Sequence, residues 1–556
     1  MKKIAKAQLQ SADEPLYHAL AGCGLSLNFP VKDLDLDGDF SYPCFPPRDV
    51  LQIMASKGHF HNVLGVPVAH SDTLLRGFWE KYKVLYPEHD IFHQTEDVDY
   101  THLLPYYIHG DGGRTYKKDP LLVLSFYNAL GEGTAMNPVE LRPVPGHHAK
   151  RRRTDGSSLE PGVNLLGNTL ANRFLFTAMK TEHYKGAPQR FQTLMDHFAN
   201  ALSELWRDGF RFNGEVWRVA ILWVCGDAPF LRECGNHNRS FSNVFKSSTS
   251  RAVMKGCCWL CSAGKTGGPP LEDVRITAAD WVQTCRRNNV LPWDVPSPLL
   301  TSLPVDDSDL AGFYKPDLFH VWHAGVGKDF VGSALVYLMK KIFPRRKIDL
   351  SLAEVNAELQ RWKKTAKEHL HFGKLTLDLL GFKSARTYPV GHWSKNMDTS
   401  TLSKFVEHLC LIGLAQHRDD EILQTMMECC GAIAHFMHML FSSPFYLNEA
   451  DGWQLIQSGQ AVLSDYAKLA KLSYDKGLCL WKLKPKLHSL AHIVLTAYLQ
   501  FHTDGFCINP IAESTFMCED FVGRISRLSR RVSAKQHGKK IFYRYMVAAH
   551  FHSQNA

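Results

Sequence analysis

The sequence predicts a mixed α/β fold that is rich in helix, and three observations support this prediction. Short apolar runs with β-branched and aromatic residues occur before residue 230 and indicate strands. From about residue 320 to the end, apolar residues recur at the spacing of amphipathic helices. A Cys-x-x-Cys pair, matched far downstream by a His-x-x-x-His pair, indicates a structural metal site within this fold.

The first two strands are expected over residues 104–126, on either side of the segment Gly110-Asp111-Gly112-Gly113. Gly and Asp are the residues that hairpin turns favour, so this segment predicts a turn between the two strands. The carboxylate of Asp111 therefore has two interpretations, as an ordinary turn residue or as part of a functional site.

A buried strand is expected over residues 216–225, and it is followed by Gly226 and Asp227. A carboxylate at this position is well placed for catalysis, because the strand is rigid and its end opens to solvent. The alternative interpretation of Asp227 is a turn residue before Pro229.

Helical periodicity is found in residues 168–208, whereas residues 135–165 are rich in Pro, Gly, Ser and basic residues and indicate a loop. The segment Ser351-Leu-Ala-Glu354 matches a capping box and predicts the start of a helix. Further helices are expected near residues 401–414, 421–441, 452–476 and 486–501.

The composition restricts the class of protein. The chain has 556 residues, of which 45% are hydrophobic and 21% charged, and this is typical of a soluble globular protein with more than one domain. No apolar run approaches the ~18 residues that a membrane span requires, and the start lacks a hydrophobic signal core. We therefore expect no membrane association, and we expect the 14 cysteines to be reduced thiols or metal ligands.

The formal net charge is +9, and most of the excess lies at the end of the chain, where residues 521–556 contain no Asp or Glu. A helix over residues 512–533 would place four basic residues on one stripe, namely Arg524, Arg527, Arg531 and Lys535. Such a stripe predicts binding to a polyanion such as double-stranded DNA, and the alternative is a solvated helix face. A second basic cluster, residues 150–153, has the composition of a nuclear-import signal or a phosphate contact.

Cys258 and Cys261 form the cysteine pair, and His488 and His492 form the histidine pair. Two thiolates and two imidazoles suit a closed tetrahedral zinc site, and histidines four residues apart share one helix face. Cys257 is a rival ligand, and a Cys-x-x-Cys pair alone could instead be redox-active. A third cluster offers further metal ligands, partners of the ligands or a buried polar group, and it consists of Asp317, His320 and His323.

Four segments together resemble the catalytic region of DDE transposases of the CACTA (En/Spm) group of transposable elements, which is related in layout to the Transib transposases and the V(D)J recombinase. They are the strand that ends in Asp227-Ala-Pro, the Cys258/Cys261 pair, the block Asp317-Leu-Phe-His320 and the closing His488/His492 pair. The resemblance spans about residues 100–535. It implies an RNase H-like core interrupted by a large all-α insertion, with a catalytic triad of Asp111, Asp227 and Glu519. Glu513 and Asp520 are rivals for the last position.

The resemblance also implies a division of the chain into four parts. Residues 1–100 would be a mostly helical region of unknown role, and residues 101–262 would hold the core strands and the Cys-x-x-Cys pair. Residues 263–500 would be the helical insertion that ends in His-x-x-x-His, and residues 501–556 would be basic helices that carry the last acid.

The implied function is that of a nuclear DNA nuclease and strand transferase, either active or a domesticated, inactive copy. Two Mg²⁺ ions held by the triad would serve catalysis, and zinc would be structural. Double-stranded DNA is the expected partner, and, as for transposases in general, a homo-oligomer is the expected assembly. One alternative is a non-catalytic, zinc-stabilised DNA-binding protein derived from such an enzyme. Another is an unrelated helical protein whose Cys-x-x-Cys pair is redox-active.

Overall fold

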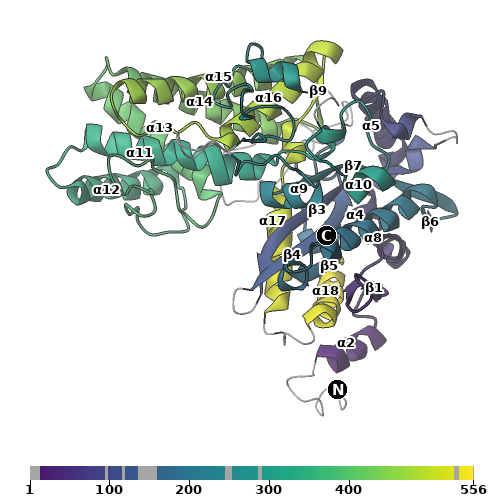
Figure 1. The fold of residues 1–556 in the computed structure, drawn as a ribbon. Coiled ribbons are helices and arrows are strands. Elements are labelled where there is room, and N and C mark those ends of the chain that lie inside the picture. The colour runs from purple at the N-terminus through teal and green to yellow at the C-terminus, as the bar shows by residue number, and fades with distance from the viewer. Residues whose placement is uncertain are drawn as a thin grey trace.

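The computed structural model describes residues 13–93, 98–115, 119–134, 160–243, 253–285, 291–530, 532 and 537–554. It has a mixed α/β fold rich in helix, as predicted, in which a five-stranded sheet lies beside a large lobe of helices (Figure 1). Four predicted features lie wholly or mostly outside the described residues: the loop at 135–165, the basic cluster 150–153, Arg531 and Lys535.

The sheet has five strands in the order β5-β4-β3-β7-β6. Their bounds are β3 (Leu103–Arg114), β4 (Pro120–Asn128), β5 (Phe174–Lys180), β6 (Phe210–Phe212) and β7 (Glu215–Gly226). The central strand β3 pairs antiparallel with β4 and parallel with β7, while β5 and β6 pair antiparallel with β4 and β7 respectively. The strand predicted at residues 216–225 is therefore confirmed as β7.

The segment from Gly110 to Gly113 lies within β3, so the turn predicted there is wrong, and the chain reverses beyond Arg114 instead. The register of β3 and β7 sets Gly110 opposite Gly226. Both positions need glycine, because an added Cβ would come within 2.2 Å and 2.5 Å, respectively, of the ring of Phe230. Asp111 and Asp227 directly follow these paired glycines, so they lie at the same edge of the sheet.

The two faces of the sheet are covered by different helices. Alternate residues of β3 point to opposite faces. On one face, Phe126 packs with Tyr106 and with Phe198 of α8 (Pro188–Arg207). The other face, which carries Asp111, is covered by α17 (Phe516–Ser529) and α18 (His537–Ser553), and the backbone N–H of Arg114 donates to Ser526 Oγ of α17 at 3.2 Å.

Helical periodicity in residues 168–208 predicted helix there; this is confirmed for α8 and for α6 (Thr169–Asn172), but β5 lies between them. All seven residues of β5 are buried, so the strand lacks the alternation of apolar and polar residues that marks a half-exposed strand. The capping-box prediction is also wrong, since Ser351 lies inside α12 (Ile348–Ala366), which begins without a side-chain cap.

The helical lobe consists of α11 (Gly327–Ile342), α12, α13 (Asp398–Gln416), α14 (Glu421–Ser442) and α15 (Glu449–Asp475), and α16 (Pro485–Asp504) leads the chain back toward the sheet (Figure 1). The four helices predicted near residues 401–414, 421–441, 452–476 and 486–501 are confirmed as α13 to α16. Within the described ranges, no helix combines the length and the apolar character that crossing a membrane requires.

The first hundred residues add short elements to the edge of the sheet. These are α2 (Asp13–Gly22), β1 (Lys32–Asp35), β2 (Ser41–Cys44), α3 (Pro47–Met54), α4 (Phe60–Leu64) and α5 (Ser71–Leu85). The backbone N–H of Phe45 donates to the carbonyl of Phe176 in β5 at 2.9 Å, and Arg544 of α18 pairs with Asp13 of α2 at 2.7 Å. This region therefore shares the core of the sheet rather than standing apart. The remaining short elements are α7 (Glu182–Lys185), α9 (Ala228–Cys234), α10 (Pro298–Ser302), β8 (Tyr446–Leu447) and β9 (Cys507–Ile508).

Candidate active site and metal centre

The four predicted metal ligands, Cys258, Cys261, His488 and His492, meet in one buried cluster. Cys261 Sγ lies 3.2 Å from His488 Nε2, Cys258 Sγ lies 3.4 Å from His492 Nε2, and the two Nε2 atoms are 3.1 Å apart. Ligand atoms of a tetrahedral zinc site are about 3.5 Å from one another, given bond lengths of about 2.0–2.3 Å. The cluster is therefore able to hold a metal ion such as zinc.

The surroundings of this cluster suit a structural site that is closed to solvent. The backbone N–H groups of Leu260 and Ala263 point at the sulfur atoms of Cys258 and Cys261, at 3.3 Å and 3.4 Å. Such donors stabilise thiolates, the form that binds metal. The ring of Trp281 packs against both imidazoles, with ring centroids 4.6 Å from each, and covers the site.

Two further thiols lie near the cluster. The rival ligand Cys257 is outside it, since its Sγ donates to the carbonyl of Ala263 at 3.5 Å. Cys285, which the sequence did not single out, hydrogen-bonds to Cys261, and its Sγ lies 3.6 Å from the carbonyl of Trp281. No spacing signal in the sequence links Cys285 to the ligand pairs.

A second cluster joins Asp111 of β3, His320 and Glu519 of α17, whose ligand atoms all lie within 4.8 Å of one another. Asp111 is 7% exposed, and His320 Nε2 lies 3.5 Å from Glu519 Oε1. The two carboxylates come from parts of the chain that are far apart in sequence. They meet because α17 packs on the face of the sheet that carries Asp111.

The electrostatics of this second cluster favour either a shared proton or a bound cation. Burial raises the pKa of Asp111 well above its usual range, and the neighbouring Glu519 raises it further. Burial also raises the pKa of Glu519, and its buried Oε1 has no hydrogen-bond partner. Two like charges that are buried together need a shared proton or cation.

The predicted acid Asp227 lies beside this cluster but is not one of its three members. Its Oδ1 accepts the backbone N–H of Phe230 at 2.8 Å and thereby caps α9. Its charge contributes to the raised pKa of both Asp111 and Glu519. The structure thus brings two of the predicted acids together and places the third close enough for its charge to act on them.

The rivals of Glu519 have other partners. Glu513 is buried, and its Oε1 pairs with Lys315 Nζ at 3.8 Å. Asp520 pairs with Arg524 at 2.6 Å and accepts the hydroxyl of Thr169 at 2.7 Å. Of the three candidates, Glu519 is therefore the one that meets Asp111.

His320 is held in place by Asp317. The buried carboxylate of Asp317 lies 2.5 Å from His320 Nδ1, and it also accepts the backbone N–H and the hydroxyl of Thr515, at 2.9 Å and 2.5 Å. Burial opposes ionisation of Asp317, but the hydrogen bonds from His320 and Thr515 outweigh it and lower its pKa. His323 lies outside the cluster, and burial lowers its pKa to about 3.

The segment that carries His320 is a π-helix, Phe319–Val326, interrupted by the non-helical backbone of Gly325. Lys486 of α16 supplies donors to two of its carbonyls, those of His320 at 2.8 Å and Ala324 at 3.1 Å. A Cβ on Gly325 would lie 2.4 Å from Cδ of Lys486, so glycine makes room for this lysine. Such irregular turns are frequent at functional sites. Because α16 also carries His488, one helix contacts both clusters.

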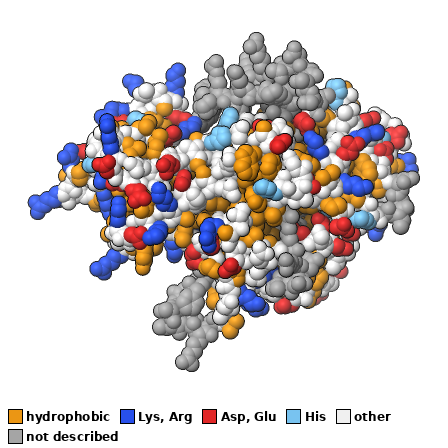
Figure 2. All heavy atoms as spheres, turned by 90° about the horizontal axis from the view of Figure 1, so that it is seen from above, with side chains coloured by type: hydrophobic (Ala, Val, Ile, Leu, Met, Phe, Trp, Pro, Cys, Tyr) orange, Lys and Arg blue, Asp and Glu red, His pale blue; other side chains and the backbone are white. Residues whose placement is uncertain are grey.

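The predicted basic stripe is described only at Arg524 and Arg527 of α17. Arg524 is engaged by Asp520, whereas Arg527 is 58% exposed and lies 3.9 Å from the same carboxylate. On the face drawn in Figure 2, Lys and Arg side chains are densest over the helical lobe, with Asp and Glu among them.

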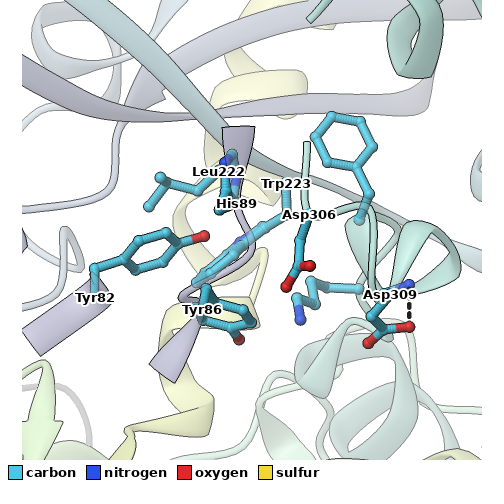
Figure 3. A pocket seen from close by; sticks show the side chains of 10 residues that line it. Tyr82, Tyr86, His89, Leu222, Trp223, Asp306 and Asp309 are labelled. Atoms are coloured by element: carbon cyan, nitrogen blue, oxygen red, sulfur yellow. Dashed lines mark hydrogen bonds between the residues drawn. The ribbon is translucent and has the colours of Figure 1, made fainter. Parts of the chain in front are cut away.

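A small pocket lies beside β7, and none of its lining residues belongs to either cluster (Figure 3). It is lined by Tyr82, Tyr86, His89, Leu222, Trp223, Asp306, Asp309, Gly312, Phe313 and Lys315. Its volume is about 20 Å³, which is room for one water molecule. Lys315 Nζ covers the rings of Trp223 and Tyr86, at 5.2 Å and 5.8 Å from their centroids. We therefore do not regard this pocket as a substrate site.

Comparisons of the sequence with protein-family models and with curated proteins found no match. The function therefore has to be argued from the two clusters and the sheet that positions them.

Proposed function

We propose that the protein is a DDE-type DNA nuclease and strand transferase of transposase origin. The observation that carries the proposal is the meeting of Asp111 and Glu519 beside Asp227. Three acids from distant parts of the chain gather at one sheet edge, and two of them have pKa values raised by burial. Buried carboxylates of this kind are what a metal-dependent phosphoryl-transfer site requires.

The arrangement of the strands supports an RNase H-like core for this enzyme. The first acid lies on the central strand β3, and the second follows its parallel neighbour β7, while β4 and β5 continue the sheet in antiparallel fashion. The helical lobe lies between the second and third acids in the chain. Because fold alone does not define function, the acids carry more weight than this topology.

The proposed chemistry is cleavage of a DNA phosphodiester. Mg²⁺ or a similar divalent ion, when bound, supplies Lewis acidity and lowers the pKa of a bound water. Asp111 and Glu519 offer the hard oxygen ligands that such ions prefer, and Asp227 would be a carboxylate ligand of a second ion. The rigid strand ends and α17 hold these oxygens in place, since errors near 1 Å can cost about 100-fold in rate.

The Cys₂His₂ cluster would serve this site indirectly. Zinc there would fasten the loop of Cys258 and Cys261 to α16, at the point where the helical lobe rejoins the core. The returning end of the lobe would thereby be held, and α17, which follows α16, would be held with it. Zinc has no redox chemistry, and four protein ligands leave it no open position, so a structural role fits best.

The proposal is tested with supercoiled plasmid DNA and the purified, zinc-loaded protein. We expect nicked and linear products with added Mg²⁺ or Mn²⁺ and none when no divalent ion is added to the zinc-loaded protein. Binding of the plasmid with no cleavage under any divalent ion would overturn the nuclease proposal. It would favour the second candidate, a non-catalytic, zinc-stabilised DNA-binding protein, which the use of Asp227 as a helix cap also favours.

DNA binding itself makes a separate prediction at Arg527. Replacing Arg527 with Gln is expected to weaken binding about threefold and to lower the slope of log affinity against log salt concentration by about 1, because one phosphate contact is lost. The matched control is Lys471→Gln, an exposed cation of α15 paired with Asp475, which should change neither quantity. Equal effects of both variants in a fluorescence-anisotropy titration would contradict a specific role for α17.

A further inference from the structure

The acidic cluster contains a histidine as well as two carboxylates, and this has a consequence for its metal. We propose that His320 is a nitrogen ligand of the catalytic ion and that the site therefore binds Mn²⁺, or a similar transition metal, in preference to Mg²⁺. The proposal deepens the proposed function and rests on it only in taking Asp111 and Glu519 as metal ligands. Its test needs neither DNA nor catalysis.

The imidazole of His320 is oriented by Asp317 so that its Nε2 atom faces the cluster. Asp317 is 3% exposed and, besides His320 Nδ1, receives hydrogen bonds from the backbone N–H groups of Phe319 and Thr515, both at 2.9 Å, and from the Thr515 hydroxyl. With these donors on its two oxygens, the Asp317 carboxylate is the acceptor of the His320 Nδ1–H. In the neutral imidazole the lone pair of His320 is then on Nε2, which faces the cluster. Metal-binding histidines almost always have such an anchored second nitrogen.

The distance between His320 and Glu519 also supports coordination of a shared ion. The Nε2 and Oε1 atoms are 3.5 Å apart, and Glu519 Oε1 is buried with no hydrogen-bond partner. A charge-assisted hydrogen bond from a protonated imidazole would bring these atoms to about 2.7–2.9 Å. Two ligands of one ion, each about 2.0–2.2 Å from it, instead stand about 3–3.5 Å apart. The observed spacing fits ligands better than it fits a direct ion pair.

The imidazole of His320 is already held in place in the absence of an ion. Lys486 holds the carbonyl of His320 at 2.8 Å, and Asp317 holds its ring. A ligand that is already oriented loses little conformational freedom on binding. Coordination by His320 therefore requires no rearrangement of the π-helix.

The metal preference follows from the donor atoms. Mg²⁺ is a hard ion that favours oxygen, whereas imidazole nitrogen raises affinity for first-row transition metals. Two carboxylates and one imidazole also leave coordination positions for water and for a phosphate oxygen. A site made of Asp111, Asp227 and Glu519 alone would lack this preference.

The test is Mn²⁺ titration of the zinc-loaded protein without DNA, followed by pulsed EPR. We expect Mn²⁺ with a ¹⁴N hyperfine coupling, and we expect displacement to require at least tenfold more Mg²⁺ than Mn²⁺. In His320→Gln the nitrogen coupling should vanish and Mn²⁺ affinity should fall about 10- to 100-fold, with zinc content unchanged. The control His392→Gln, a histidine that is 47% exposed and remote in sequence, should behave like the wild type.

Three outcomes would overturn the proposal: no Mn²⁺ binding, coordination by oxygen alone, or a nitrogen coupling that survives in His320→Gln. If that variant fails to fold, as judged by melting temperature and zinc content, His320→Asn provides the same comparison with a smaller side chain. Nitrogen-coordinated Mn²⁺ in a protein that never nicks DNA would overturn the proposed function and leave this inference standing. Nicking of DNA by a protein whose Mn²⁺ is coordinated by oxygen alone would overturn this inference and leave the proposed function standing.

Discussion

Replacing Asp227 with Asn is expected to abolish nicking of DNA in the presence of divalent ions, with a loss of at least about 10³-fold in rate. An amide is neutral and binds hard cations poorly, so the second ion that we propose for Asp227 would not be held. The fold should be unaffected, because the amide oxygen of Asn can still accept the backbone N–H of Phe230 and cap α9. Plasmid nicking, zinc content and melting temperature are the measurements, and undiminished nicking would remove Asp227 from the catalytic site.

On α17, Asp520 provides a matched control for a substitution at its neighbour Glu519. Glu519→Gln removes a carboxylate that meets Asp111, and we expect the same loss of nicking as in Asp227→Asn. Asp520→Asn is the same chemical change one residue away, at a carboxylate that pairs with Arg524, and it should keep most of the activity. Equal loss in both variants would indicate that α17, and not one acid, had been disturbed.

Replacing His488 with Ala is expected to remove zinc and to destabilise the protein. One of four ligands is lost from a fully buried site, and three remaining polar ligands are left without their shared ion. We expect the zinc content to fall from about one ion per chain to near zero and the free energy of unfolding to fall by about 3–5 kcal/mol. Metal analysis and thermal unfolding measure these two changes.

Cys257→Ser is the matched control for the zinc prediction. Cys257 is adjacent to a ligand and equally buried, but its thiol donates to the carbonyl of Ala263, and a serine hydroxyl can make the same hydrogen bond. Zinc content and stability should therefore stay close to those of the wild type. A fall in zinc in Cys257→Ser, or full zinc occupancy in His488→Ala, would show that the ligands are assigned wrongly.

The sequence predicted the parts of the fold whose pattern is local. The buried strand β7 and the helices α13 to α16 were recognised because their apolar spacing repeats over many residues. It did not predict β5, whose two faces are both buried, nor the course of β3 through Gly110 to Gly113. There, glycine is required by the ring of Phe230 rather than by a turn, and this reason exists only in the folded chain.

The sites show the same division between local and long-range information. The four residues of the Cys₂His₂ cluster could be found because the spacing within each pair is typical of zinc ligands. Glu519 could not be distinguished from Glu513 and Asp520 by sequence, since its selection depends on how α17 packs against β3. His320 was noticed in the sequence without an assigned role. Its role depends on the direction of its ring, which Asp317 and Lys486 set.

The helical lobe leaves the core at the π-helix and returns to it at α16, and Lys486 binds these two points to each other. The segments at which the chain enters and leaves the lobe are thus neighbours in space, although more than a hundred residues of chain separate them. The far helices can consequently lengthen, shrink or be exchanged in evolution without shifting Asp111, Asp227 or Glu519. Diversity in what this lobe touches is compatible with an unchanged arrangement of these acids at the sheet edge.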